Sequence, residues 1–95
     1  MSTINLSLQI LPKVPDARTY EVVDLVIKMI EESGIKFMVG PMETTMQGEM
    51  DELFDIVKKA HQICLDAGAE RVGAMIKTDC KPGGVTMDEK IYKYR

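Results

Sequence analysis

Hydrophobic and polar residues alternate with a period of two at the start of the chain, in the stretch TINLSLQIL that covers residues 3–11. One face of this stretch carries Ile4, Leu6, Leu8 and Ile10. The opposite face carries Asn5, Ser7 and Gln9. Such alternation predicts a strand with one buried and one exposed face, and Pro12 and Pro15 indicate that the strand ends in a short loop.

The period changes to that of a helix over residues 17–33. Val23, Ile27 and Ile30 recur at helical spacing, and further apolar residues flank them. This pattern predicts an amphipathic helix with a broad apolar stripe. Gly34 predicts its end, because glycine readily adopts the left-handed conformation that closes many helices.

Two short strands and a second helix are predicted next. Residues 35–41 and 43–47 contain many residues that favour strands, and a Gly-Pro pair ends the first of the two stretches. The helix that follows has an acidic first turn, which the helix dipole favours, and it ends at Gly68. Its apolar face carries Leu53, Val57, Ala60 and Cys64.

A last strand and a short terminal helix complete the predicted set of elements. Residues 69–79 alternate again between two faces, which predicts a strand. Thr86 and Glu89 have the spacing of a capping box, in which each residue binds the backbone of the other. We therefore expect a short helix over residues 87–94.

The predicted order of elements is β-α-β-β-α-β, within a single domain that spans residues 1–95. Two halves of the form strand, helix, glycine, strand predict a ferredoxin-like α+β fold. This fold is a two-layer sandwich, with two helices on one face of a four-stranded antiparallel sheet. The open face of the sheet would carry Asn5, Ser7, Gln9, Met75 and Lys77. A chain this small is not expected to cover that face by itself, so we expect self-association as a dimer or tetramer.

Composition and charge argue against several classes of partner. The chain has 12 Lys and Arg residues against 15 Asp and Glu residues, and this acidic balance disfavours nucleic acid, which requires a basic stripe. No apolar run approaches the roughly 20 residues of a membrane span. The first residues read as a strand and not as a signal peptide, so we expect a cytoplasmic protein.

Patterns typical of catalysis or metal binding are weak. The single histidine, His61, is expected to be a partly packed helix residue, and Cys64 lies on a core face, where burial raises the pKa of a thiol. Cys64 and Cys80 lack the spacing of a metal site and are expected to be reduced thiols. An enzyme using His61 or Glu43 as a general base would lack a second catalytic group. We therefore expect no enzymatic activity, no cofactor and no metal.

The stretch ETTMQ is the strongest candidate for a binding site. Glu43, Thr45 and Gln47 share one face of the predicted third strand, and Thr44 points to the other. In this arrangement the carboxylate can accept a hydrogen bond from an exocyclic amine, and the hydroxyl or the amide can form hydrogen bonds with the nitrogens of a heteroaromatic ring. If the first and third strands pair, this ladder is extended by Asn5, Ser7 and Gln9. The plainer interpretation is a strand with a polar solvent face.

Almost the whole chain resembles the thiamine-binding, YkoF-like family of small proteins, through LQILPKVPD, ESGIKF, VGPMETTMQGEMDELFDIVKKAH and GGVTMDEKIYKYR. The resemblance implies a ferredoxin-like fold that pairs through its sheets into dimers and often tetramers. It also implies binding of thiamine or its hydroxymethylpyrimidine moiety without known chemistry. The matching site positions are Glu43, Thr44, Thr45 and Gln47, with the polar face of the first strand as a pocket wall. The chain departs from the family at position 47, where glutamate is commoner, and at position 43, where many members have glycine.

Two functions remain open. The first is non-enzymatic binding of thiamine or hydroxymethylpyrimidine on the open sheet face of a homo-oligomer, and an acidic protein with Glu43 in the pocket suits a cationic ligand. The second is a structural or regulatory homo-oligomer whose open face is only an interface and holds no small molecule.

Overall fold

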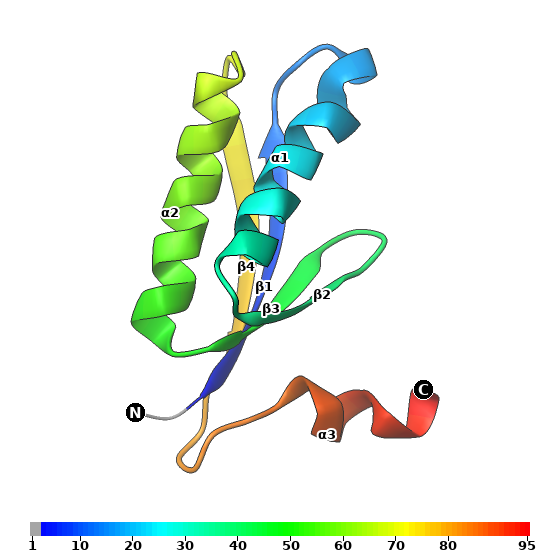
Figure 1. Cartoon of the computed structure of the whole chain (residues 1–95), viewed down its shortest axis with the longest axis vertical. Coiled ribbons are helices and arrows are strands. Elements are labelled where there is room, and N and C mark those ends of the chain that lie inside the picture. Colours follow the sequence, from blue (N-terminus) through cyan, green and yellow to red (C-terminus); the bar gives the residue numbers. More distant parts are fainter. Residues whose placement is uncertain (1–2) are drawn as a thin grey trace.

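The computed structural model describes residues 3–95, and its elements follow the predicted order (Figure 1). The strands are β1 (Ile4–Pro12), β2 (Lys36–Val39), β3 (Thr44–Gly48) and β4 (Val72–Asp79). The helices are α1 (Thr19–Glu32), α2 (Met50–Asp66) and α3 (Met87–Ile91). Short 3-10 helices cover Asp16–Arg18 and Tyr92–Tyr94.

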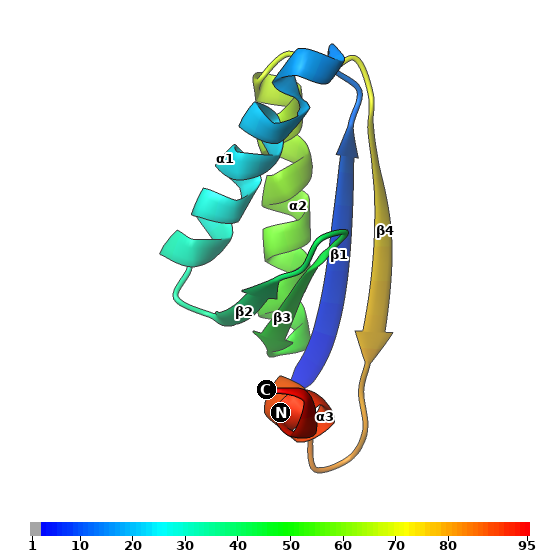
Figure 2. The same ribbon diagram turned by 90° about the vertical axis from the view of Figure 1, so that its right-hand side faces the viewer.

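The four strands form one antiparallel sheet in the order β2-β3-β1-β4. Seen from the side, α1 and α2 both lie against the same face of this sheet (Figure 2). The central strand β1 pairs with β3 through its first half and with β4 along most of its length. The predicted ferredoxin-like α+β sandwich is therefore confirmed.

The core lies between the sheet and the two long helices. From β1 it contains the predicted face Ile4, Leu6, Leu8 and Ile10. From the helices it contains Val22, Val26, Ile30, Leu53, Ile56, Val57, Ala60 and Cys64. Full burial of an aliphatic side chain contributes about 1.5–3 kcal/mol, so this shared interface is what fixes the helices on the sheet.

The helix α1 differs in detail from the prediction. It begins at Thr19, because residues 16–18 form a 3-10 turn after Pro15. Its buried residues are Val22, Val26 and Ile30, so Ile30 of the predicted line is buried as expected, whereas Val23 and Ile27 of that line are only half-buried. Both lines are apolar and adjacent on the helix surface, so the sequence pattern alone does not distinguish them.

Both long helices end at glycines in the left-handed conformation, as predicted. The φ angle is 80° at Gly34 and 96° at Gly68. A side chain at either position would be strained, because residues other than glycine rarely adopt this backbone conformation. These two glycines turn the chain back from the helix layer into the sheet.

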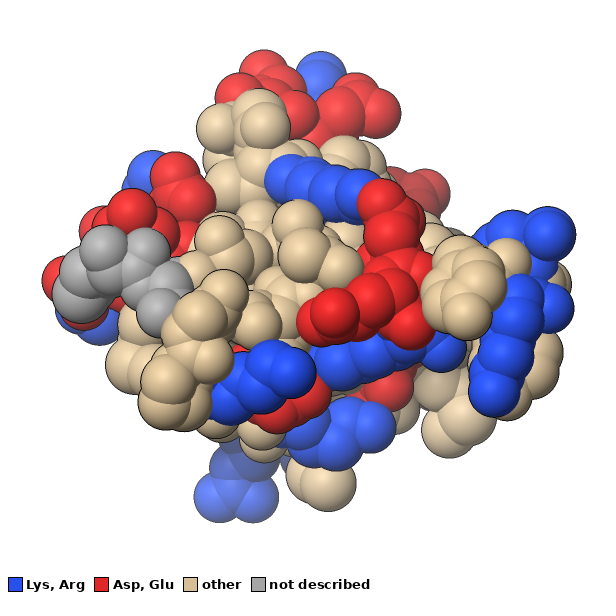
Figure 3. Space-filling model, turned by 90° about the horizontal axis from the view of Figure 1, so that it is seen from below, with Lys and Arg blue, Asp and Glu red and all other residues tan. Residues whose placement is uncertain are grey.

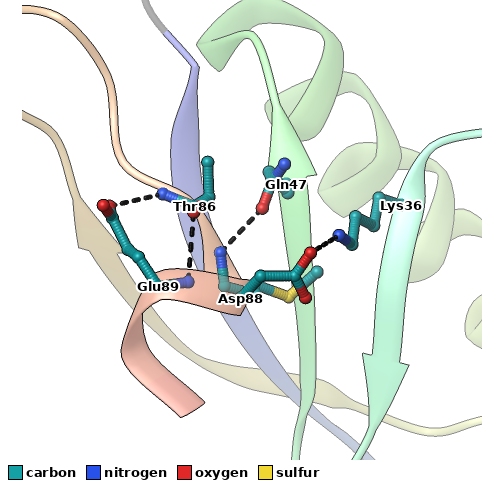
Figure 4. Close-up of polar contacts among 6 residues, drawn as sticks. Lys36, Gln47, Thr86, Asp88 and Glu89 are labelled. Atoms are coloured by element: carbon teal, nitrogen blue, oxygen red, sulfur yellow. Dashed lines mark hydrogen bonds and ion pairs between the residues drawn. The ribbon is translucent and has the colours of Figure 1, made fainter. Parts of the chain in front are cut away.

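The C-terminal segment lies across one end of the open face, where β1 begins. The predicted capping box is present, since Thr86 Oγ1 accepts from the Glu89 backbone at 3.2 Å and Glu89 Oε1 accepts from the Thr86 backbone at 2.8 Å (Figure 4). The Met87 backbone donates to Gln47 Oε1 at 2.7 Å, and Asp88 pairs with Lys36 of β2. The C-terminal segment therefore covers one end of the open face, and Met75, farther along the same face, remains exposed.

Candidate ligand-binding site on the open sheet face

The strand register arranges the side chains of the open face in rows. Directly opposed residues of antiparallel strands have their side chains on the same face. One row consists of Lys36, Gln47, Asn5 and Asp79. The next row consists of Met38, Thr45, Ser7 and Lys77. Two pairs of the predicted ladder, Asn5–Gln47 and Ser7–Thr45, are therefore present, whereas Gln9 and Glu43 lie beyond the last pair of β1 and β3.

A pocket of about 330 Å³ lies over these two rows, with α3 as one wall. Its volume falls at the lower end of the range of about 300–1,000 Å³ for small-molecule sites. From the sheet and the loop before β3 it is lined by Asn5, Ser7, Met38, Glu43, Thr45, Lys77, Thr78 and Asp79. From α3 it is lined by Met87, Lys90 and Ile91.

Two polar groups in the pocket are buried and have no partner. Asn5 is 5% exposed and Ser7 is 8% exposed. Among the described residues, neither Asn5 Nδ2 nor Ser7 Oγ has a hydrogen-bond partner. A buried polar group left in this state costs about 1–3 kcal/mol, so a ligand atom that satisfies it gains a corresponding advantage.

The other end of the Asn5 amide is held by α3. Lys90 Nζ donates to Asn5 Oδ1 at 2.8 Å and lies 2.6 Å from Asp79 Oδ2. This arrangement leaves Asn5 Nδ2 as the free end of the amide. Asn5 is therefore a pocket-lining residue whose amide nitrogen is a buried donor without a partner among the described residues.

Glu43 stands at the opposite side of the pocket as an ionised acceptor. Lys77 Nζ lies 3.1 Å from Glu43 Oε1. The neighbouring Ser7 hydroxyl and the Lys77 ammonium hold the pKa of the Glu43 carboxyl below its usual value, although Ser7 Oγ makes no hydrogen bond of ordinary geometry. Glu43 is therefore ionised at neutral pH, and its side chain, about 36% exposed, remains accessible.

The structure divides the predicted site residues into three groups. Asn5, Ser7, Glu43 and Thr45 line the pocket together. Gln47 lies on the same face, but its side-chain oxygen is occupied by the backbone of α3. Gln9 and Thr44 lie outside the pocket, at a second hollow of about 250 Å³ between α1, β1 and the loop at 39–43.

Sequence reasoning missed the contribution of α3. Met87, Lys90 and Ile91 are spaced i, i+3 and i+4, so they share one face of the short helix. The capping box predicted this helix, and its spacing could have identified the face, but nothing in the pattern indicates where the helix docks. Asp79 was also missed, because its role depends on the ion pair with Lys90.

Of the residues considered for catalysis, His61 and Cys64 lie on α2, in the helix layer. His61 Nδ1 is 2.8 Å from the Val57 carbonyl oxygen of the same helix. Cys64 is buried, and burial raises the pKa of its thiol, as expected. Within residues 3–95, no three His, Cys, Asp or Glu side chains are grouped as a metal site would require, and no helix is long and apolar enough to cross a membrane.

The surface at the α3 end carries charges of both signs. Viewed from this end, Lys and Arg side chains are intermixed with Asp and Glu side chains (Figure 3). Three of the lysines of the open face are paired with carboxylates, namely Lys36, Lys77 and Lys90. The pocket is therefore locally balanced in charge, and its polar selectivity depends on the geometry of individual groups.

Comparison with known proteins gives consistent results. Residues 6–95 match the family described as thiamine-binding protein. The chain is 62% identical to a UPF0045 protein of Clostridium perfringens. This alignment extends over 95 residues and covers 100% of both proteins. A solved Bacillus cereus domain of unknown function superposes with a TM-score of 0.92 and 45% identity, covering 99% of this chain and 91% of that one.

A second solved structure comes from Thermotoga maritima and is provisionally assigned to thiamine biosynthesis or salvage. It superposes with a TM-score of 0.91 and 38% identity, and covers 98% of this chain and 99% of that one. Matches of this coverage span nearly the whole chain. The chain therefore belongs to the thiamine-binding protein family.

Proposed function

We propose that the protein binds thiamine, or its hydroxymethylpyrimidine moiety, in the pocket on the open sheet face. The observation that carries this proposal is the pair of buried polar groups, Asn5 Nδ2 and Ser7 Oγ, that line the pocket without a partner. Membership of the thiamine-binding protein family supports the class of ligand.

The chemistry of the pocket suits an aminopyrimidine ring. Such a ring presents an exocyclic amine, which donates, beside a ring nitrogen, which accepts. Glu43 supplies an acceptor for the amine, Asn5 Nδ2 supplies a donor for the ring nitrogen, and the Ser7 hydroxyl can do either. The side chains of Met38 and Met87 offer adaptable apolar surface to the faces of the ring.

Binding without catalysis fits the protonation states of these groups. A general base works best when its pKa lies near the working pH, whereas the pKa of Glu43 is shifted downward, away from neutrality. The two lysines of the pocket are engaged in ion pairs, Lys77 with Glu43 and Lys90 with Asp79. We therefore propose a protein that holds its ligand unchanged.

A homo-oligomer would complete the site. The pocket is open to solvent, and Met75, one row beyond it on β4, is 62% exposed. Burying such an apolar side chain against a second copy of the chain is favourable and would also shield the ligand. A dimer or tetramer assembled through this face is part of the proposal.

Titration calorimetry with thiamine, hydroxymethylpyrimidine and oxythiamine tests the proposed function. Oxythiamine carries a carbonyl oxygen in place of the amine, so we expect it to bind at least roughly tenfold more weakly than thiamine. Glu43→Gln should weaken thiamine binding. The matched control is Glu70→Gln, because Glu70 also pairs with a lysine, Lys13 at 3.4 Å, but lies away from the pocket.

The competing function predicts a different result. A structural homo-oligomer without a ligand would show no heat with thiamine or hydroxymethylpyrimidine at near-millimolar concentration, while sedimentation still showed a stable oligomer. That combination would overturn the proposal and favour the structural role.

A further inference from the structure

We propose that Lys90 is a positioning residue that determines which ligands the pocket accepts, because it fixes the orientation of the Asn5 side-chain amide. This inference rests on the proposed function and deepens it. It assigns to the C-terminal helix α3 a role in selectivity, in addition to its role as a wall of the pocket.

The orientation of the Asn5 amide follows from the chemistry of its neighbour. A lysine ammonium group has three donors and no acceptor, so the Asn5 atom 2.8 Å from Lys90 Nζ must be the amide oxygen. Asp79 Oδ2 lies 2.6 Å from the same ammonium group and holds it in place. Asn5 is 5% exposed, so its amide cannot exchange this contact freely for water.

Fixing the oxygen on Lys90 leaves the amide nitrogen as the group offered to the ligand. Asn5 Nδ2 is buried and has no partner among the described residues. The pocket therefore requires an acceptor at this point. The ring nitrogen of an aminopyrimidine satisfies that requirement, whereas the ring N–H of the oxo analogue would place a donor against a donor.

Loss of Lys90 would remove this constraint. Without the ammonium group, the Asn5 amide can rotate by about half a turn and offer its oxygen to the ligand. The pocket would then tolerate a donor as well as an acceptor. Lys90 thus acts on selectivity between two kinds of ligand, and its effect on overall affinity is secondary.

The test is the ratio of the dissociation constants of oxythiamine and thiamine, measured for four proteins. We expect Lys90→Met to reduce this ratio by roughly tenfold relative to the wild type, the scale of one mismatched buried hydrogen bond. Lys90→Arg retains a donor toward Asn5 and should preserve the ratio. Lys36→Met removes the other lysine that anchors α3, through Asp88, but does not touch Asn5, so it should also preserve the ratio.

A further variant tests the same point without altering α3. Asn5→Asp can keep its contact with Lys90, but it offers a carboxylate oxygen to the ligand, so we expect the preference to shift toward oxythiamine. An unchanged ratio in Lys90→Met with thiamine still bound would overturn the inference. An equal loss in Lys36→Met would also overturn it, since docking of α3 alone would then explain the effect. If the wild type binds neither compound, the proposed function fails, and the inference fails with it.

Discussion

Lys90 Nζ lies 2.8 Å from Asn5 Oδ1, although 85 positions separate the two residues in the chain. The contact is possible because β4 runs antiparallel to β1 and returns the chain to the end of the sheet where β1 begins. The capping box then starts a new helix at that point. The first strand and the last helix thus build one pocket.

Ser7→Ala should separate stability from ligand binding. The Ser7 hydroxyl is buried without a hydrogen bond of ordinary geometry in the free protein, so its removal relieves a burial cost but also removes its effect on the Glu43 carboxylate. These two changes oppose each other, and the free energy of unfolding should stay nearly unchanged. Thiamine affinity should fall. Ser33→Ala is the matched control, because that hydroxyl donates to the Ile30 carbonyl, and its loss should cost about 0.5–1.5 kcal/mol in urea unfolding.

The contribution of Glu43 to binding should persist to unusually low pH. The Ser7 hydroxyl and Lys77 lower the pKa of this carboxyl in the folded protein. Its role as an acceptor and its contribution to stability are therefore fully present above pH values of about 4.3, the ordinary pKa of a glutamate. Both are lost as the pH falls through the lowered pKa. Calorimetry of wild type and Glu43→Gln across pH checks this. The ligand is the same in both titrations, so its own protonation affects both affinities equally and does not contribute to their difference. A difference in affinity that disappears already near pH 6 would contradict the assignment.

Thr86→Ala should loosen α3. The substitution removes the hydroxyl that caps the helix, a change that typically costs about 1 kcal/mol. Amide hydrogen exchange should accelerate in residues 87–91 and remain unchanged in α2, and thiamine should bind more weakly. Thr19→Ala is the control, because α1 has no side-chain cap. Equal exchange in both variants would show that the capping box does not hold α3.

Met75→Lys should weaken self-association. Met75 is 62% exposed on the open face, and a lysine there would place a charge in the proposed interface between copies. Sedimentation velocity should show smaller species than for the wild type at the same micromolar concentration. Met42→Lys alters a methionine in the loop before β3 that is 74% exposed, and it should leave the assembly intact. An unchanged oligomer in Met75→Lys would place the interface elsewhere.

The fold follows closely from local patterns in the sequence. The alternation of β1 predicted both its buried face and its polar face, and the glycines at 34 and 68 predicted the ends of the helices. The parity of β3 placed Thr44 on the buried side and Thr45 on the open side. Each of these features depends on residues that are close in the chain or on the two-residue period of a strand. They can therefore be predicted from the sequence.

The site was less predictable, because it depends on tertiary contacts. Asn5, Ser7, Glu43 and Thr45 were expected to lie together, and the register brings them to one pocket. The use of Gln47 as an anchor for α3, and the contact of Lys90 with Asn5, depend on where a five-residue helix docks. The position of α3 is set by a few polar contacts between segments that are distant in the chain. The pattern of hydrophobic and polar residues does not predict such contacts.

A crystal structure of the complex with thiamine tests the central claim most directly. We predict an aminopyrimidine ring in the pocket, with a ring nitrogen within about 3.2 Å of Asn5 Nδ2 and the exocyclic amine within the same distance of a Glu43 oxygen. The Lys90–Asn5 contact should persist. A ring bound elsewhere, or one that leaves Asn5 Nδ2 and Ser7 Oγ without partners, would contradict the account.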